Sequence, residues 1–514
     1  MNLAWTAPSS RQRILSFFSL ARTTALLITL LYLPPASQTQ SLKSRVIVGA
    51  LIVDGTGRKA FPASVRIVGD RIAKVGNFST RADDEVINAT GMIVAPGFID
   101  IHNHSDGAML SEPTLASQVS QGITTIAVGP DGGSPWPIAA YLGKLEAKPA
   151  AVNVLSFVGH ATVRQLVMGK DYNRKANEKE IAQMAQLVEQ GMREGAFGVS
   201  TGLEYDVGHP SSTEEVIELA KTAARYGGIY MSHIRDEADE VMSAFSEAIR
   251  IGREAHIPVQ ISHIKLGTVG VWGQAGKAID LINSARLSGV DVTADCYPYD
   301  AWSSTITVLI PSRRHEDPIA VKRGLDDVGG PANVLVTNCK AHRDYESKTL
   351  DEIAREQRLS PVDVYIQIVK DGGASVVCRS MQESDISAFY RQPWVMVASD
   401  GQAGGRHPRG AGTFTRVLGR FVRERQWITL EEAVRKMSAA PASRLGLSDR
   451  GLVREDMKAD LVLFDPKRVI DRSTFKEPTV LSTGIERVFV NGEPVWVQEK
   501  TTGRLPGIVI KRTH

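Results

Sequence analysis

The chain has 514 residues, of which 43% are hydrophobic and 23% are charged, a balance that supports a sizeable buried core and excludes a disordered or fibrous protein. Its formal net charge of +3 comes from Arg11, Arg13 and Arg22, because residues 1–37 contain no lysine or acidic residue. Without that stretch the chain is neutral and has no general electrostatic attraction to nucleic acid. Its three cysteines, none spaced as CxxC, exclude a disulfide framework.

Residues 1–37 have the features of a secretory signal peptide. The three arginines precede an apolar stretch over 24–33, and small residues suited to cleavage follow it. We therefore expect this segment to be removed and the mature protein to be periplasmic or secreted. The alternative is an uncleaved N-terminal anchor, although the apolar stretch is short for a membrane span. No other segment is predicted to cross a membrane.

Short alternating runs that are typical of β-hairpins occur near both ends of the chain. They cover 45–48, 64–68 and 71–75 in the first part, and 460–464 and 488–495 in the last, where Asn491-Gly492 favours a tight turn. Neither part is long enough for a closed core of its own. We expect residues 38–95 and 446–514 to combine into one small β-sandwich.

Between these ends, eight apolar runs alternate with segments of helical periodicity. The predicted strands are 92–101, 123–128, 152–158, 196–201, 229–233, 258–263, 291–294 and 394–400. This order predicts an α/β fold with a (β/α)8 (TIM) barrel over residues 96–445. Residues from about 304 to 381 are too many for one crossover, so we expect a small helical insert over the mouth of the barrel.

Histidine and aspartate follow several of these strands directly. His102 and His104 lie two residues apart after the first strand, His233 and His263 end two consecutive strands, and Asp400 ends the eighth. Because the carboxyl ends of barrel strands meet on one face, these side chains should converge there. Imidazole and carboxylate are ligands of divalent metals. The alternative for the first pair is two solvated loop histidines.

Ordered motifs along the chain give it a resemblance to a known family. It resembles the amidohydrolase superfamily, and more narrowly the N-acyl-D-amino-acid deacylases (D-aminoacylases), from about residue 46 to 497. The motifs that carry the resemblance are His102-Asn103-His104, Ser232-His233, Ser262-His263-Ile264-Lys265, Ser399-Asp400-Gly401, the runs 121–125, 200–203, 295–299 and 459–465, and His407-Pro408-Arg409.

The resemblance implies a site with one or two divalent metal ions, expected to be Zn²⁺. His102, His104, His233 and His263 would be ligands, and Asp400 would be both a ligand and the general base for the attack of metal-activated water. Many relatives use a carboxylated lysine from the fourth strand, and D-aminoacylases commonly place a cysteine where this chain has Asp131. This chain has neither, so Glu204 is the expected bridging carboxylate and Asp131 the alternative. Either residue could instead cap a loop.

The same resemblance assigns the substrate carboxylate to Lys265, Tyr297 and Arg409, with Ser303 as a further candidate. Each of these could instead be a surface charge or a packed side chain. Trp302 and Trp272 could line an acyl pocket or pack in loops, and His160 could support the site or be structural.

The predicted activity is metal-dependent hydrolysis of the amide bond of small N-acyl-D-amino acids or similar acylated amino compounds. Alternatives are a cyclic-amide hydrolase of the dihydroorotase or hydantoinase kind, a dipeptidase, and a non-catalytic metal- or ligand-binding protein on the same scaffold. The expected partner is the small-molecule substrate alone, and the sequence predicts no oligomeric state.

Overall fold

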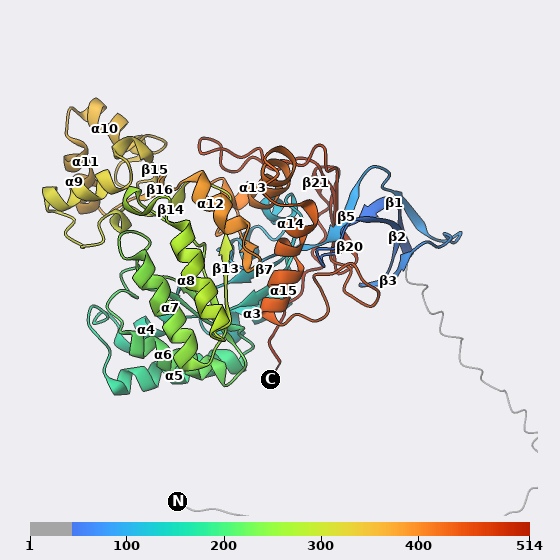
Figure 1. Ribbon diagram of the computed structural model, residues 1–514, viewed down its shortest axis with the longest axis horizontal. Helices are drawn as coiled ribbons and strands as arrows, with labels where there is room; N and C mark the ends of the chain where they lie inside the picture. The colour runs from blue at the N-terminus through green and yellow to red at the C-terminus, as the bar shows by residue number, and fades with distance from the viewer. Residues whose placement is uncertain (1–43, 514) are drawn as a thin grey trace, which may run out of the picture. The chain divides into compact units, whose positions relative to one another are not determined.

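The computed structural model of the protein describes residues 44–513 (Figure 1). The predicted signal peptide, residues 1–37, lies outside the described residues. Within 44–513 no helix has both the length and the apolar character that crossing a bilayer requires.

A barrel of eight parallel strands forms the centre of the described chain and confirms the predicted fold class. Its strands are β6 (Phe98–Asp100), β7 (Ile123–Val128), β8 (Asn153–Ser156) with its continuation β9 (Val158–Gly159), β10 (Gly198–Gly202), β11 (Ile229–His233), β12 (Val259–Ile261), β13 (Val292–Cys296) and β17 (Val395–Val397). The barrel closes where Asn103 bridges Gly401 in parallel, with a hydrogen bond of 2.9 Å from the Asp400 amide to the His102 carbonyl.

Helices surround these strands (Figure 1). In α7 (Val241–Ala255), Val241, Phe245, Ala248 and Gly252 are buried at helical spacing, so one face packs on the barrel. The others are α1 (Ala108–Ser111), α2 (Ala116–Val119), α3 (Ile138–Ala147), α4 (His160–Met168), α5 (Glu178–Arg193), α6 (Thr213–Ala224), η1 (Val269–Val271), α8 (Ala275–Leu287), α12 (Glu383–Tyr390), α13 (Arg409–Arg416), η5 (Val417–Glu424), α14 (Leu430–Met437) and α15 (Ala439–Leu445).

The predicted first strand, 92–101, is in fact two strands that belong to different sheets. Residues of β5 (Ile93–Pro96) pair with β1 and β18, whereas β6 pairs with β7 in the barrel. Gly97 separates them, and a Cβ there would lie 2.3 Å from the side chain of Thr124. The chain can pass this close to the next barrel strand only because residue 97 has no side chain.

Both ends of the chain contribute to one nine-stranded sheet. Its order is β21-β20-β19-β18-β5-β1-β2-β3, with β4 paired to β1. The antiparallel β5–β18 pair joins the two ends, over a core that includes Ile67, Leu461 and Phe489. The remaining bounds are β1 (Ser44–Ile52), β2 (Phe61–Val68), β3 (Arg71–Gly76), β4 (Glu85–Asn88), β18 (Leu461–Phe464), β19 (Ile485–Val490), β20 (Glu493–Val497) and β21 (Lys500–Thr501).

The segment between β13 and β17 contains helices and also a small sheet that the sequence did not predict. Strands β14 (Trp302–Thr305), β16 (Ser375–Cys378) and β15 (Val334–Asn338) form an antiparallel sheet in that order. The helical elements are η2 (Ile306–Leu309), α9 (Pro318–Asp327), η3 (Pro331–Asn333), η4 (Arg343–Tyr345), α10 (Leu350–Gln357) and α11 (Pro361–Lys370). We call this segment, residues 302–378, the insert.

The C-terminal tail packs along the edge of barrel strand β8. Val509 bridges Val154 in parallel, and the Ile510 amide donates to the Val154 carbonyl at 2.7 Å. The tail thus satisfies backbone groups of β8 that would otherwise lack partners.

Candidate metal centre and active site

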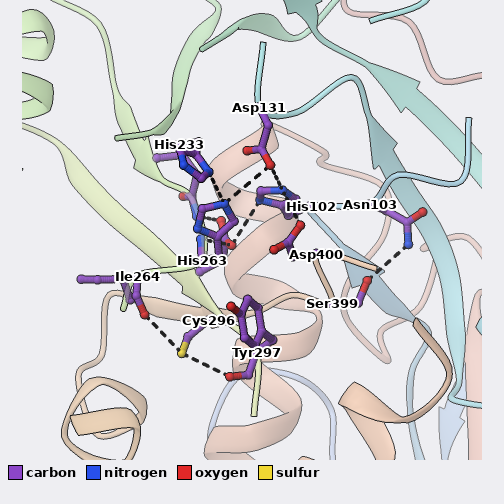
Figure 2. A network of polar contacts seen from close by, with 12 residues as sticks. His102, Asn103, Asp131, His233, His263, Ile264, Cys296, Tyr297, Ser399 and Asp400 are labelled. Carbon is purple, nitrogen blue, oxygen red and sulfur yellow. Dashed lines mark hydrogen bonds and ion pairs between the residues drawn. The ribbon is translucent and has the colours of Figure 1, made fainter. Parts of the chain in front are cut away.

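Seven side chains from six of the barrel strands meet at the carboxyl ends of those strands. His102 and His104 follow β6, Asp131 follows β7, Glu204 follows β10, His233 ends β11, His263 follows β12 and Asp400 follows β17. Parallel strands in a closed barrel place these ends on one face, and Figure 2 shows Asp131 and Asp400 directed at the imidazoles of His102 and His263.

Asp131 lies at the centre of this cluster. Its Oδ2 is 3.3 Å from His102 Nε2, 3.4 Å from His104 Nε2 and 3.6 Å from His263 Nε2. Glu204, by contrast, contacts one imidazole of the cluster, with 2.8 Å between its Oε2 and His233 Nε2. The structure therefore places the alternative carboxylate, Asp131, between the histidines and the expected one, Glu204, at their edge.

Two further contacts complete the cluster. His233 Nδ1 is 2.9 Å from His263 Nε2, which joins the second pair of histidines. Asp400 Oδ1 is 3.1 Å from His104 Nε2 and 3.4 Å from His102 Nε2, so it faces the first pair.

The donor set fits a divalent cation. Both ring nitrogens of His102 and Oδ1 of Asp131 are buried and make no hydrogen bond with any of the described residues, an arrangement that costs free energy unless a ligand is present. Potential ligand atoms within 4.8 Å of one another form three groups, and two of these groups share Asp131. The groups are His102, His104, Asp131 and Asp400; Asp131, His233 and His263; and Glu204, His233 and Glu237. All donors are nitrogen or oxygen, as Zn²⁺ accepts.

Electrostatics keep both central aspartates ionised. Burial alone would raise the pKa of Asp400, but Arg409, His263 and His102 outweigh it and hold that pKa well below its usual range. Burial likewise opposes ionisation of Asp131, yet His102 and His263 hold its pKa well below the usual range. The site thus contains two buried carboxylates that are anionic at neutral pH.

Three of the converging residues have a left-handed backbone. The φ angle is 54° at Asp131, 34° at His263 and 47° at Asp400. A residue with a side chain adopts this region at a cost of about 1–3 kcal/mol, and such residues cluster at functional sites. Here the surrounding strands fix the conformation, and it directs each side chain into the cluster.

Asp100 anchors the loop that carries Asp400, a role that the sequence did not reveal. Its carboxylate accepts hydrogen bonds from Ser399 Oγ at 2.5 Å, the Ser399 amide at 2.9 Å and Asn103 Nδ2 at 2.8 Å. Figure 2 shows the Asn103–Ser399 contact of the same network. These bonds fix the ends of β6 and β17 relative to each other, and with them His102 and Asp400.

Glu237, Asp295 and Tyr205 also contact the predicted residues and were missed. Glu237 Oε1 is 3.1 Å from His263 Nδ1, Asp295 accepts from the His263 amide at 2.7 Å, and the Tyr205 hydroxyl is 3.1 Å from His233 Nδ1. The available signals were the position of Glu237, four residues after His233, and that of Asp295, which opens the motif 295–299. Contacts of this kind orient metal-binding imidazoles.

Lys265 and Arg409 bring two buried cations beside the cluster. Lys265 Nζ donates to Glu237 at 2.5 Å, and Arg409 Nη1 is 2.6 Å from Asp400 Oδ2. Burial alone would lower the pKa of Lys265, but Glu237 raises it, so the ammonium stays charged. The Tyr297 ring lies 5.0 Å from the Arg409 guanidinium and 5.9 Å from Lys265 Nζ.

Of the four predicted substrate-binding residues, three line a cavity and one does not. Lys265, Ser303 and Arg409 line a cavity of about 330 Å³ that also reaches His233, His263 and Asp400. Tyr297 is not among the lining residues, and its hydroxyl lies 3.9 Å from Met381 Sδ. Of the tryptophans, Trp302 lines the cavity and Trp272 does not.

His160 does not belong to this cluster. Its Nε2 is 2.8 Å from Glu215 Oε1, and Glu215 also pairs with Arg164 at 2.5 Å. All three side chains are fully buried between α4 and α6, so the structural reading of His160 holds.

Comparisons with known proteins agree with this geometry. A model of the amidohydrolase family matches residues 85–262 and 280–496. A D-aminoacylase from Alcaligenes xylosoxydans xylosoxydans is 36% identical over 91% of this chain and 97% of its own length. An N-acyl-D-glutamate deacylase from the same organism is also 36% identical, over 91% of this chain and 96% of its own.

A solved structure shows the same fold with bound ligands. The N-acyl-D-glutamate deacylase of Bordetella bronchiseptica, complexed with zinc and a phosphonate that mimics the tetrahedral intermediate, superposes with a TM-score of 0.83. It is 34% identical, and the match covers 92% of this chain and 100% of that one.

Proposed function

The chain belongs to the amidohydrolase family, and from that premise we propose that it is a metal-dependent hydrolase that cleaves the amide bond of N-acyl-D-amino acids. The proposal rests on one arrangement of side chains. Four histidines and two ionised aspartates converge at the barrel mouth, and two buried cations, Lys265 and Arg409, lie directly beside them.

One or two divalent cations, with zinc as the expected metal, would be held by the four histidines together with Asp131. Asp400 and Glu204 are further oxygen donors at opposite sides of the cluster. The zinc in the Bordetella relative supports this choice of metal. A divalent cation bound here supplies Lewis-acid activation of a water molecule and of the substrate carbonyl.

Asp400 is the group placed to move the proton. Its carboxylate takes a proton from the attacking water as the new C–O bond forms, and it delivers that proton to the amide nitrogen as the C–N bond breaks. Arg409, 2.6 Å from Asp400 Oδ2, keeps the carboxyl group acidic, so the proton is readily released to the departing amine.

Lys265 and Arg409 provide the charge that recognises an amino-acid carboxylate. An ammonium and a planar guanidinium together offer several donors for one carboxylate. An ammonium has three N–H donors and a guanidinium has five. Lys265 Nζ contacts Glu237 and His263 Nδ1. Arg409 Nη1 contacts Asp400, so each cation has further donors for the substrate. Ser303 lines the same cavity and is the remaining polar candidate.

Hydrolysis of N-acetyl-D-alanine in ¹⁸O-labelled water tests the proposed reaction. We expect the zinc-loaded protein to release acetate and D-alanine in equal amounts, with one ¹⁸O atom in the acetate and none in the D-alanine. Failure of the fully metal-loaded protein to release any amino acid from N-acetyl-D-amino acids would contradict the proposal.

We also propose that the protein is exported and that residues 1–37 are its signal peptide. The support is the order of arginines, apolar stretch and small residues in that segment. N-terminal sequencing of active protein recovered from the periplasm or the medium should show a start near residue 38. Active protein that retains Met1 and remains in the cytoplasm would contradict export.

A further inference from the structure

The cavity above the metal-binding cluster has an apolar wall that the reaction itself does not explain. Its floor is the catalytic face, with Lys265, Asp400 and Arg409. Another part of the lining comes from η2, the turn that follows it, α9 and the residue after α9, all in the insert, and its apolar members are Val308, Leu309, Ile310, Pro311, Ala320 and Val328. The volume of about 330 Å³ is at the lower end of small-molecule sites.

Cations elsewhere in the cavity lining are already paired. Arg323 Nη2 lies 2.7 Å from Asp239, and its Nε lies 3.6 Å from Asp327. Arg314 pairs with Asp317 at 3.1 Å, and both arginine side chains are about 70% exposed at the rim. Unlike the buried Lys265 and Arg409, these two arginines are neutralised by aspartates in solvent, so they attract a second substrate carboxylate only weakly.

The other charges at the rim are acidic. Asp236 and Glu240 line the cavity together with Asp239 and Asp327. An anionic substrate group in this space would face like charges and an apolar wall, and the nearby donors are neutral hydroxyls, such as those of Ser304 and Ser312, which do not neutralise its charge. A neutral apolar group would bury its surface against the insert.

We propose that the insert wall is the specificity pocket for an apolar, uncharged group of the substrate, so that the enzyme discriminates against N-acyl-D-amino acids with acidic side chains. The inference rests on the proposed function. Overall similarity does not decide the point, because the D-aminoacylase and the D-glutamate deacylase relatives are equally similar to this chain. The apolar group is either the amino-acid side chain or the acyl chain, and both present the same chemistry to the wall. In the second case the amino-acid side chain would lie elsewhere in the same cavity, beside its acidic residues, so an acidic side chain is disfavoured in both cases.

Two series of substrates, assayed with the zinc-loaded enzyme, show whether the side chain or the acyl chain is the apolar group in the pocket. The first varies the side chain of the N-acetyl-D-amino acid through alanine, norvaline, leucine, aspartate and glutamate. The second varies the acyl chain of N-acyl-D-alanine from acetyl to butanoyl to hexanoyl. We expect kcat/KM to rise about fourfold per buried methylene in one series, and that series identifies the group in the pocket. The acidic substrates should be at least about 100-fold poorer than leucine or norvaline.

A pair of variants tests the wall directly. Val308 is half-buried and lines the cavity, whereas Ile319 is 80% exposed on α9 of the same insert and does not line it. V308R places a cation in the pocket, so it should lower kcat/KM for the preferred apolar substrate and raise it for the acidic ones, each by about tenfold or more. I319R adds the same charge outside the cavity and should leave both values unchanged.

The outcomes separate this inference from the function on which it rests. Equal or better turnover of the acidic substrates, no rise in either series, or equal effects of V308R and I319R would overturn the pocket assignment while the deacylase function stands. Absence of hydrolysis throughout both series would overturn the deacylase function and the pocket assignment with it.

Discussion

Replacing Asp131 by asparagine should empty part of the metal centre. Asn keeps the shape of the side chain and tolerates the left-handed φ of 54° at this position, so the substitution removes charge without adding backbone strain. Asp131 Oδ2 lies within 3.6 Å of nitrogens on three histidines. A carboxylate placed there joins two of the three possible ligand groups, so its loss weakens both.

The expected loss of zinc affinity in D131N is judged against the loss expected for a residue at the edge of the cluster. Loss of a group that only orients a ligand weakens metal binding by about 10–100-fold, so loss of a shared ligand should exceed about 100-fold, or about 2.7 kcal/mol. D131N should therefore retain half of the wild-type zinc or less after equilibration at a zinc concentration that just saturates the wild type. E204Q is the matched control, because Glu204 contacts one histidine of the cluster, at 2.8 Å.

Elemental analysis of the dialysed proteins gives the metal-to-protein ratio, and thermal unfolding checks that each variant is folded. D131N is expected to lose metal at a zinc concentration where E204Q retains it. If E204Q lost its metal while D131N bound zinc like the wild type, Glu204 would be the bridging carboxylate and the central position of Asp131 would have no role in binding.

Three further predictions concern single residues. D400N should lower kcat by about 10²–10⁴-fold with most of the zinc retained, because it removes the proton acceptor; restoration of activity by added zinc would show that Asp400 acts mainly as a ligand. K265M should raise KM for N-acetyl-D-alanine by about 10–100-fold through loss of a charged hydrogen bond, but not for N-acetyl-D-alaninamide, which lacks the carboxylate; equal effects on both would exclude carboxylate binding by Lys265. E215Q should destabilise the protein by about 3–5 kcal/mol in urea unfolding, because it leaves Arg164 and His160 buried without their anion; an unchanged midpoint would show that this cluster is not stabilising.

The barrel could be predicted because its signals are local. Each strand is a short apolar run, and the ligand types stand directly at strand ends, as with His233 and Asp400. The rule that parallel strand ends share one face then brings distant residues together without knowledge of any contact. The structure does place all four histidines and Asp400 in one cluster.

The features that the sequence could not predict depend on distances between loops or strands that are far apart in the chain. The choice between Asp131 and Glu204 turns on how far two loops reach across the barrel mouth, and neither loop carries a periodic pattern. The division of 92–101 into two strands depends on the close approach of Gly97 to Thr124, which is a tertiary contact. The roles of Asp100 and Glu237 depend likewise on partners that only the fold supplies.

Zinc titration of the metal-free protein with N-acetyl-D-alanine as substrate tests the central claim most directly. Chelator-treated protein should be inactive, and hydrolysis should appear in proportion to bound zinc, with the D-enantiomer preferred over the L-enantiomer by at least about 100-fold (about 2.7 kcal/mol). Full activity without metal, or equal hydrolysis of both enantiomers at full zinc occupancy, would contradict a metal-dependent D-amino-acid deacylase.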